Sequence, residues 1–346
     1  MRLTRRRTRT VAAAATLAVI VGATASACGS SDSGSADEQA ITVYNAQHEE
    51  LTQAEADAFT AQTGIKVTMR NGDDSEMSNQ IVQEGAASPA DVFLTENSPG
   101  MSLVDSKGLF AKVDKATLDQ VPAQYSPADG NWVGWAARST VLPYNTTKLT
   151  PQQLPASIMD LAQPQWKGKI GISPSGADFQ AIVSAVVQLK GEDAAAAWLK
   201  GLKENAKIYK GNTSVMKAVN AGEIDAGVIY HYYWYKDQAE SGSSSKNVQL
   251  KYFGNADPGA FVSVSGGGVL KSSKHQEAAQ KFVNFLTSQK GQQILSDSTA
   301  LEYSIASGVP ANAKLKPLTE LNAPKVDVGA LNGPRVVALM QQTGLI

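Results

Sequence analysis

The sequence predicts an α/β fold with two lobes, each built on a central mixed, mainly parallel sheet flanked by helices. Strand and helix signals alternate from Ile41 onward, and the same alternation returns after Ile170. This β-α-β order produces parallel sheets with helices on their faces. The chain has 346 residues, more than one hydrophobic core usually covers, so two lobes are expected, with the chain crossing between them.

Short apolar strands separated by helices are predicted in the first half. The strands are Ile41 to Tyr44, Ile65 to Met69 and Asp91 to Leu94. Apolar residues recur at helical spacing between them, and the two helices end at Gly64 and near Gly85. Glycine suits these ends because it readily adopts the left-handed conformation that follows many helices.

The second half repeats this order. The predicted strands are Ile170 to Ile172 and Ile224 to Tyr230. The predicted helices lie around Phe179 to Leu189, Ala194 to Leu202, Val215 to Val219 before Gly222, and Gln276 to Ser288. Ligands of such sheets bind beyond the carboxyl ends of the strands, so a functional site is expected at that edge.

Residues 1–27 have the order of a secretory signal peptide. Five arginines precede a small apolar run from Val11 to Val21, and Ala25-Ser26-Ala27 stands before Cys28. The junction resembles a bacterial lipobox, which makes Cys28 the predicted lipidation site. Ordinary cleavage that leaves a free thiol is the alternative. Residues 28–38 then read as the lipidated cysteine and a flexible polar tether.

Composition argues against several classes of protein. Cys28 is the only cysteine, so no disulfide can form within the chain. All 32 acidic residues follow it, whereas five of the 31 basic residues precede it, so the exported part is acidic and nucleic acid is not an expected partner. No later stretch reaches the ~20 apolar residues of a membrane helix. We expect an exported monomer, anchored by lipid at the outer face of the cytoplasmic membrane.

Polar side chains gather where three predicted strands end. His48 follows the first strand, Glu96 follows the strand that ends at Leu94, and Tyr232 and Tyr233 follow Tyr230. An oxygen-rich set with a single nitrogen suits a hard, highly charged cation. The candidate metal ligands are His48, Glu96, Tyr232 and Tyr233.

The two tyrosines can share one ion only if the strand ends before them. Neighbouring side chains point to opposite faces of a strand, whereas they diverge by about 100° in a helix. The site therefore predicts a break in the strand near His231. Each candidate also has an ordinary structural role, as a capping histidine, a solvated carboxylate or packed aromatic rings.

Segments spread along the chain carry a family resemblance. They are ITVYNAQHEE (41–50), TGIKV (63–67), SPADVFLTE (88–96), PQWKGKIG (164–171), AAAAWLKGLK (194–203), GEIDAGVIYHYYW (222–234), DPGA (257–260) and VLKSSK (269–274). Together they resemble the bacterial ferric-ion-binding proteins, the iron(III) solute-binding components of ABC importers. The resemblance covers essentially the whole chain after the tether.

The resemblance implies a periplasmic-binding-protein type II fold whose lobes are joined by two hinge strands. Its iron ligands fall on the four candidates named above, and Fe(3+) is the expected cargo. The implied N-terminal lobe is residues 39–140 plus 263–306, and the implied C-terminal lobe is residues 141–262 plus 307–346. The implied partners are the permease and the ATPase of an iron importer.

The best-known members of that family complete the iron site with an external anion such as phosphate or carbonate. The candidate anion-binding residues here are Asn97, Arg138, Ser175, Gly176, Ala177 and Asn212. The pattern departs from the family because Asn97 stands where glutamine is usual and Tyr230 where asparagine is usual. Asp178 adds a negative charge to the loop that contains Ser175, Gly176 and Ala177. Arg138 has an alternative role, in which it braces the hinge through a carboxylate.

Other functions were weighed against iron binding. The same fold can bind an oxyanion, thiamine or a polyamine, although these solutes do not need the four candidate ligands. A secreted metallo-hydrolase is a second alternative, but the chain has no H-E-x-x-H, G-x-S-x-G or P-loop motif, so no enzyme is predicted. A sensor or adhesion module on this fold is a third.

Overall fold

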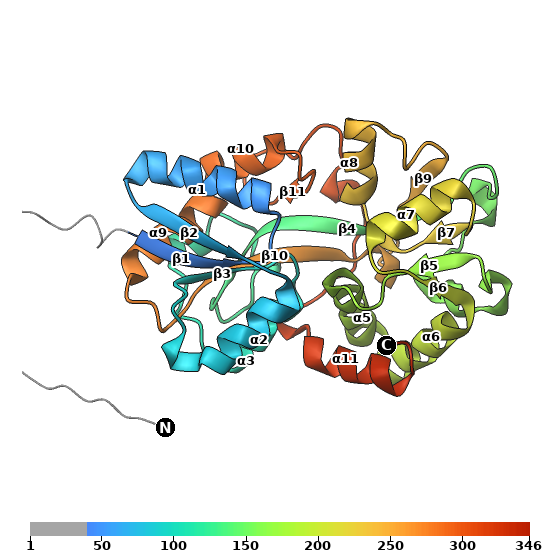
Figure 1. Cartoon of the computed structure of the whole chain (residues 1–346), viewed down its shortest axis with the longest axis horizontal. Helices are drawn as coiled ribbons and strands as arrows, with labels where there is room; N and C mark the ends of the chain where they lie inside the picture. Colours follow the sequence, from blue (N-terminus) through green and yellow to red (C-terminus); the bar gives the residue numbers. More distant parts are fainter. Residues whose placement is uncertain (1–39) are drawn as a thin grey trace, which may run out of the picture. The chain divides into compact units, whose positions relative to one another are not determined.

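The strands of the computed structural model, which describes residues 40–346, join into one mixed sheet (Figure 1). They are β1 (Ala40–Asn45), β2 (Lys66–Asn71), β3 (Val92–Leu94), β4 (Val133–Asn145), β5 (Ile170–Ile172), β6 (Ala206–Ile208), β7 (Ala226–Gly227), β8 (Ile229–Tyr230), β9 (Val248–Lys251), β10 (Val262–Val269) and β11 (Tyr303–Ser304). The predicted signal peptide, the lipidation site Cys28 and the tether lie outside the described residues.

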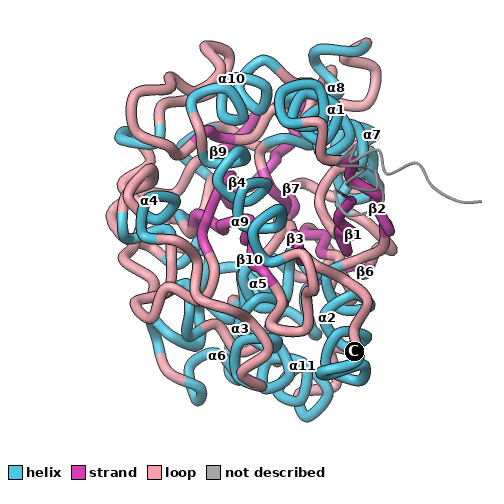
Figure 2. Tube along the Cα trace, turned by 90° about the vertical axis from the view of Figure 1, so that its left-hand side faces the viewer, coloured by secondary structure: helices cyan, strands magenta, loops and turns pink. Residues whose placement is uncertain are grey.

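Helices lie on both sides of these strands (Figure 2). They are α1 (Glu49–Thr63), α2 (Asp74–Glu84), α3 (Ser98–Ser106), α4 (Lys115–Leu118), α5 (Ala177–Lys190), α6 (Glu192–Asn205), α7 (Asn212–Ala221), α8 (Tyr232–Glu240), α9 (Gln276–Thr287), α10 (Gln289–Asp297) and α11 (Gly333–Gln342). None of the helices within residues 40–346 is both long and apolar enough to cross a bilayer.

The two long strands β4 and β10 link two groups of parallel strands. The sheet order is β2-β1-β3-β10-β4-β7-β5-β6, with β8, β9 and β11 also paired to β4. Strands β1, β2 and β3 are parallel, as are β5, β6 and β7, whereas β4 and β10 pair antiparallel to their neighbours. The predicted α/β class, a mixed sheet flanked by helices, is therefore confirmed.

The partners of β4 change in the middle of the strand. Up to Ser139 it pairs with β10 and β11, and from Thr140 onward it pairs with β8, β9 and β7. The first parallel group reaches β4 through β10, because β10 pairs with β3 on one side and with β4 on the other. Both long strands therefore connect the two parallel groups. The predicted lobe boundaries themselves stay a prediction.

Most predicted elements are confirmed, and one is wrong. Helices α1 and α7 end at Gly64 and Gly222, whose φ angles of 77° and 74° are left-handed. The predicted strand from Ile224 to Tyr230 is divided into β7 and β8. The division occurs because β7 lies between β4 and β5, whereas β8 pairs with β4 alone. The Val228 amide, between the two strands, donates to the Gly171 carbonyl.

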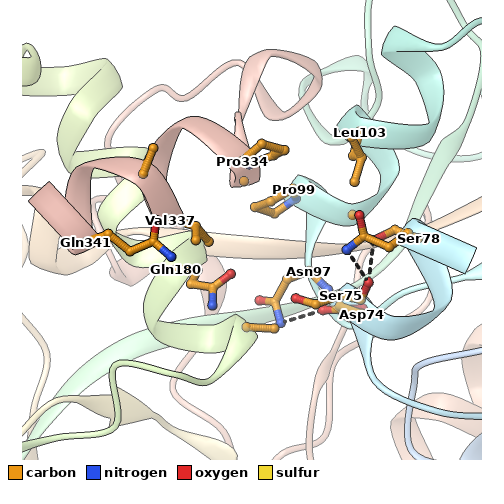
Figure 3. A pocket seen from close by; sticks show the side chains of 15 residues that line it. Asp74, Ser75, Ser78, Asn97, Pro99, Leu103, Gln180, Pro334, Val337 and Gln341 are labelled. Carbon is orange, nitrogen blue, oxygen red and sulfur yellow. Dashed lines mark hydrogen bonds between the residues drawn. The ribbon is translucent and has the colours of Figure 1, made fainter. Parts of the chain in front are cut away.

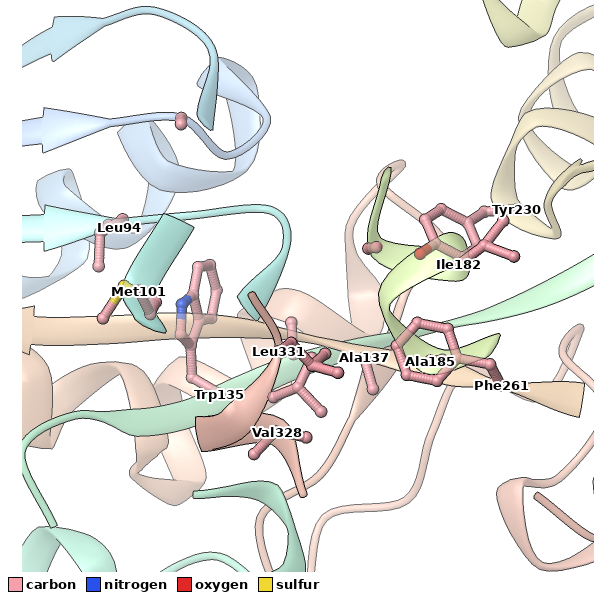
Figure 4. Packing of buried hydrophobic residues seen from close by; sticks show 14 of the residues in the cluster. Leu94, Met101, Trp135, Ala137, Ile182, Ala185, Tyr230, Phe261, Val328 and Leu331 are labelled. Carbon is pink, nitrogen blue, oxygen red and sulfur yellow. The ribbon is translucent and has the colours of Figure 1, made fainter. Parts of the chain in front are cut away.

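A continuous apolar core surrounds the long strands (Figure 4). It brings together residues from β4, α5 and the C-terminal segment, including Trp135, Ala137, Ile182, Ala185, Val328 and Leu331. On β10, a Cβ at Gly266 would lie 2.3 Å from a side-chain carbon of Met101. Glycine at this position therefore allows α3 to pack directly against the strand.

Candidate metal-binding site

Each predicted metal ligand lies just beyond the end of a strand. His48 comes between β1 and α1, and Glu96 comes between β3 and α3. Tyr232 is the first residue of α8, directly after β8 and His231. The predicted break near His231 is confirmed, so Tyr232 and Tyr233 project from a helical turn rather than from opposite faces of a strand.

The four predicted ligands lie in one cluster. His48 Nδ1 is 3.4 Å from Glu96 Oε1. The His48 ring meets the Tyr232 ring edge-on, with centroids 5.1 Å apart. The Tyr232 and Tyr233 rings are stacked at 4.2 Å. The imidazole, the carboxylate and both phenols are thus neighbours, although they come from three separate segments.

Asp178 accepts hydrogen bonds from both phenols. The hydroxyls of Tyr233 and Tyr232 donate to its Oδ2 at 3.1 Å and 3.5 Å, and the Asn212 amide donates to the same oxygen at 2.8 Å. The Asn97 amide donates to Oδ1 at 3.0 Å. Asp178 also lies in the first turn of α5, where the helix dipole stabilises a negative charge. Asp178, which the sequence marked only as an added negative charge, is therefore central to the cluster.

A cavity of about 400 Å³ opens beside this cluster. Its lining includes His48, Glu96, Tyr233, Asp178, Gly176, Ala177, Asn212 and Lys210. Tyr232 is only 1% exposed and lies outside the lining. Of the six candidate anion-binding residues, the cavity thus brings together Gly176, Ala177 and Asn212, whereas Ser175, Asn97 and Arg138 do not line it.

Arg138 is fully buried and held by two carboxylates. Its Nη2 lies 2.6 Å from Glu302 Oε2 and donates to Ser265 Oγ at 2.9 Å. Its Nη1 lies 3.3 Å from Glu96 Oε2. This geometry agrees with the alternative role, in which Arg138 braces the predicted hinge through a carboxylate.

Burial determines the protonation of the predicted oxygen ligands. It raises the pKa of Glu96 to about 7, with a further increase from Asp178 and an opposing effect of Arg138. Burial and the nearby Asp178 carboxylate also raise the pKa of Tyr232 and of Tyr233 well above the usual value. Both phenols are therefore protonated in the metal-free protein, which agrees with their hydrogen bonds to Asp178.

The His231 ring packs edge-on against the ring of Tyr232, but its Nδ1 and its stacked face contact residues other than the predicted ligands. Its Nδ1 accepts the Ser139 amide at 3.1 Å, and its ring stacks on Tyr303 with centroids 4.7 Å apart. Burial lowers the pKa of His231 to about 3, so the ring is neutral. It braces the start of α8 against β4.

Two carboxylates near the ligands were missed by the sequence analysis. Asp74 accepts the backbone amides of Glu96 and Asn97 at 2.9 Å and 3.0 Å, and so fixes the chain at the end of β3. Glu302 is buried between α10 and β11 and contacts His48 and Arg138. The available signal in the sequence was slight: Asp74 stands at a helix start, and Glu302 is a lone acid between Leu301 and Tyr303.

Figure 3 shows a second cavity, of about 320 Å³. Helices α2, α3, α5 and α11 contribute its lining, which includes Asp74, Asn97, Pro99, Gln180, Pro334 and Gln341. Asp74 and Ala177 line both cavities. Its walls are amide, hydroxyl and aliphatic groups, and Asp74 is their one charged side chain, so no cation-binding set is gathered there.

The donor set of the cluster fits a hard cation. Within residues 40–346 no group of three or more His, Cys, Asp or Glu side chains is arranged to hold a metal, so the tyrosines are needed to complete any site. One imidazole, two carboxylates and two phenols provide mainly oxygen donors. Such donors favour small, highly charged ions over soft metals.

Comparisons with known proteins agree with this fold and donor set. The profile of bacterial extracellular solute-binding proteins matches residues 87–326. An Fe(3+)-binding periplasmic protein of Serratia marcescens is 60% identical over 309 residues, which cover 89% of this chain and 91% of that protein. Iron-bound HitA from Pseudomonas aeruginosa has a TM-score of 0.83 and 44% identity, covering 88% of this chain and 99% of its own. A Trichodesmium protein (IdiA, FutA) in complex with iron and citrate has a TM-score of 0.75 and 30% identity, covering 88% and 99%. The chain belongs to the family of bacterial extracellular solute-binding proteins.

Proposed function

We propose that this protein captures ferric iron outside the cytoplasm and delivers it to the permease of an ABC importer. One observation carries the proposal. His48, Glu96, Tyr232 and Tyr233 come together in a chain that is 60% identical to an Fe(3+)-binding periplasmic protein. Oxyanions, thiamine and polyamines need no such set of ligands, so ferric iron is the cargo that accounts for it best.

The chemistry of capture follows from the protonation of the free site. A ferric ion displaces the protons of Tyr232 and Tyr233, because its charge stabilises the phenolates by more than burial destabilises them. Glu96 and His48 supply a carboxylate oxygen and a ring nitrogen. Asp178, released from the phenol hydroxyls, contributes its negative charge beside the same oxygens.

We infer that Asp178 takes the part of an external anion. A phosphate or carbonate ion would bind at Gly176, Ala177 and Asn212, but Asp178 already accepts the Asn212 amide at 2.8 Å. A second negative charge at that place would be repelled. Iron binding by the wild-type protein should then be independent of phosphate and carbonate, whereas Asp178→Asn should bind more weakly and regain affinity when either anion is added. Unchanged affinity in Asp178→Asn would contradict this inference.

The proposed lobes are residues 39–140 plus 263–306 and residues 141–262 plus 307–346. The change of partners along β4 between Ser139 and Thr140, together with the start of β10 at Val262, supports these boundaries. His48 and Glu96 belong to the first lobe, and Tyr232 and Tyr233 belong to the second. Iron bound by both sets would hold the lobes closed.

The proposed location is the outer face of the cytoplasmic membrane, with lipid on Cys28 as the anchor. The lipobox-like junction and the polar tether support this location. The partners are the permease and the ATPase of the importer, and the binding protein acts as a monomer. The proposed role is binding and delivery, without a catalysed reaction.

A competition experiment tests the proposed cargo. The iron-free protein is dialysed against ferric iron held by a weak chelator, and in parallel against sulfate, thiamine and spermidine. We expect one ferric ion per chain and no retention of the other solutes. Glu96→Gln should bind iron more weakly, whereas Glu50→Gln, an exposed residue at the start of α1, should match the wild type. Retention of another solute without iron would overturn the proposal.

A further inference from the structure

Glu302 is a fully buried carboxylate that reaches two residues of the candidate site. Its Oε1 lies 3.0 Å from His48 Nε2, and its Oε2 lies 2.6 Å from Arg138 Nη2. Among the described residues, neither His48 Nε2 nor Glu302 Oε1 has a hydrogen-bond partner of regular geometry, so the 3.0 Å approach between them is an ion-pair contact. Each of these atoms is therefore available only to the other.

Two further contacts close a ring of four charged or ionisable side chains. Arg138 Nη1 lies 3.3 Å from Glu96 Oε2, and Glu96 Oε1 lies 3.4 Å from His48 Nδ1. The ring runs from His48 to Glu302, Arg138, Glu96 and back to His48. Its members come from four separate segments, so only the folded chain brings them together.

Neighbouring groups fix this ring in place. Ser265 Oγ accepts Arg138 Nη2 at 2.9 Å and Gln47 Nε2 at 2.8 Å. Leu301, directly before Glu302, has a φ of 53°, which is unusual for a bulky residue. Such backbone conformations persist only where surrounding contacts impose them, and they are enriched at functional sites. The backbone at Leu301 is therefore locally strained where it positions Glu302.

We propose that Glu302 is the positioning residue for the two first-lobe iron ligands. It holds His48 through Nε2, so that Nδ1 is the nitrogen presented beside Glu96 Oε1. It also supplies the counter-charge for Arg138, so Glu96 remains free to bind the ion instead of serving as that counter-charge. This proposal rests on the ferric iron function proposed above.

The physical reason lies in how imidazole ligands are held. A histidine that binds a metal through one nitrogen usually donates its other N–H to a carboxylate, which fixes the tautomer and the ring orientation. Glu302 is the carboxylate that faces the far nitrogen of His48. A buried guanidinium without a partner is strongly unfavourable. Removing the charge of Glu302 would therefore draw Glu96 towards Arg138 and away from the ion.

The first test reads the tautomer of His48 without any iron. The iron-free protein is labelled with ¹⁵N-histidine and measured at alkaline pH. The His48 signals are assigned by their loss in His48→Ala. A proton on Nε2 supports the proposal, and a proton on Nδ1 overturns it. The reading is possible even if the protein binds no iron, so it is independent of the proposed function.

The second test is a double-mutant cycle on ferric iron affinity. Glu302→Gln should weaken iron binding about 10- to 100-fold. The same change in a His48→Ala background should cost markedly less, because the two residues act through one contact. Glu84→Gln is the control, since Glu84 at the end of α2 is also a hydrogen-bonded carboxylate, but its partners are Tyr44, Gln80 and Ser88 rather than residues of the candidate site. It should bind iron as the wild type does.

A conservative variant separates positioning from folding. Glu302→Asp keeps the negative charge near Arg138 but shortens the side chain, so it should fold and still bind iron more weakly than the wild type. Full affinity in a folded Glu302→Asp or Glu302→Gln variant would overturn the proposal while leaving the iron function intact. Failure of the wild type to bind iron would contradict the proposed function. The tautomer measurement would still show whether Glu302 orients His48.

Discussion

The side-chain amide of Asn97 donates one hydrogen bond to Asp178 Oδ1 at 3.0 Å and another to Asp74 Oδ2 at 3.1 Å. Asp74 begins α2, whereas Asp178 lies in the first turn of α5, so a single amide joins elements of the two proposed lobes. Tyr230 strengthens this junction, because its hydroxyl donates to Asn97 Oδ1 at 3.3 Å. The metal-free chain therefore has a bond of its own across the proposed cleft.

Asn97→Ala should shift the iron-free protein towards an open form. A hydrogen bond to a charged group contributes about 1.5–3 kcal/mol, which corresponds to roughly a tenfold or larger change in the balance of closed and open forms. Small-angle scattering should show a larger radius of gyration for the iron-free variant than for the wild type. Asn79→Ala is the control, because the Asn79 amide bonds only within α2. Equal radii for all three proteins would refute a bond that holds the lobes.

Iron affinity should fall as the pH falls, and more steeply below about pH 7. Both phenols must lose a proton at any pH in this range, since their pKa values are raised. Glu96, with a pKa of about 7, is ionised above that pH and must also lose a proton below it. Chelator competition between about pH 6 and about pH 8 measures the slope. Glu96→Gln should reduce the steepening, because Glu96 no longer has a proton to lose, and a pH-independent affinity would argue against phenolate ligands.

The neutral His231 should make the iron-free fold sensitive to acid. Its folded pKa of about 3 lies below the unfolded value of about 6.5, so the unfolded chain binds more protons between these values. Stability from this residue is therefore present at neutral pH and is lost as the pH falls below about 6.5. The loss amounts to about 2 kcal/mol at pH ~5.

Denaturant unfolding of His231→Asn measures this effect. Asparagine can still accept the Ser139 amide but does not titrate, so the difference in stability between wild type and variant should shrink on going from pH ~7 to pH ~5. A difference that does not change with pH would mean that His231 is not held neutral.

Cys28→Ala should release the protein from the membrane without changing iron affinity. The lipobox-like junction places the predicted lipid on this thiol, and the polar tether separates it from the folded part. Cell fractionation should find the wild type with the membrane and the variant in the soluble exported fraction. A variant that stays with the membrane would place the anchor elsewhere.

Local patterns predicted the parallel parts of the fold well. The short strands around β1, β3 and β5 and the helices that end at Gly64 and Gly222 follow directly from apolar spacing and glycine. The long strand β4 was not found in this way, because every residue in it is buried and no polar alternation marks its faces. The split of β7 from β8 was missed because it depends on pairing with β5 and β4, which are distant in sequence.

The candidate site shows the same division. His48, Glu96 and the two tyrosines could be named because they follow strand ends directly. The sequence marked Asp178 only as an added negative charge. Its hydrogen bonds to the two phenols depend on the tertiary contact between α5 and α8. Glu302 is far along the chain from every predicted ligand, and only tertiary contacts bring it to His48.

The visible absorption of the iron-loaded protein tests the central claim most directly. Phenolates bound to ferric iron give a charge-transfer band, so titrating the colourless iron-free protein with ferric iron should produce colour at one ion per chain. Tyr232→Phe and Tyr233→Phe should each shift or weaken the band and lower the affinity, because each removes one oxygen and keeps the ring. Tyr235→Phe, on the same helix, should leave the band unchanged, since its hydroxyl contacts Tyr252 instead. An unchanged band and affinity in both Tyr232→Phe and Tyr233→Phe would contradict the account.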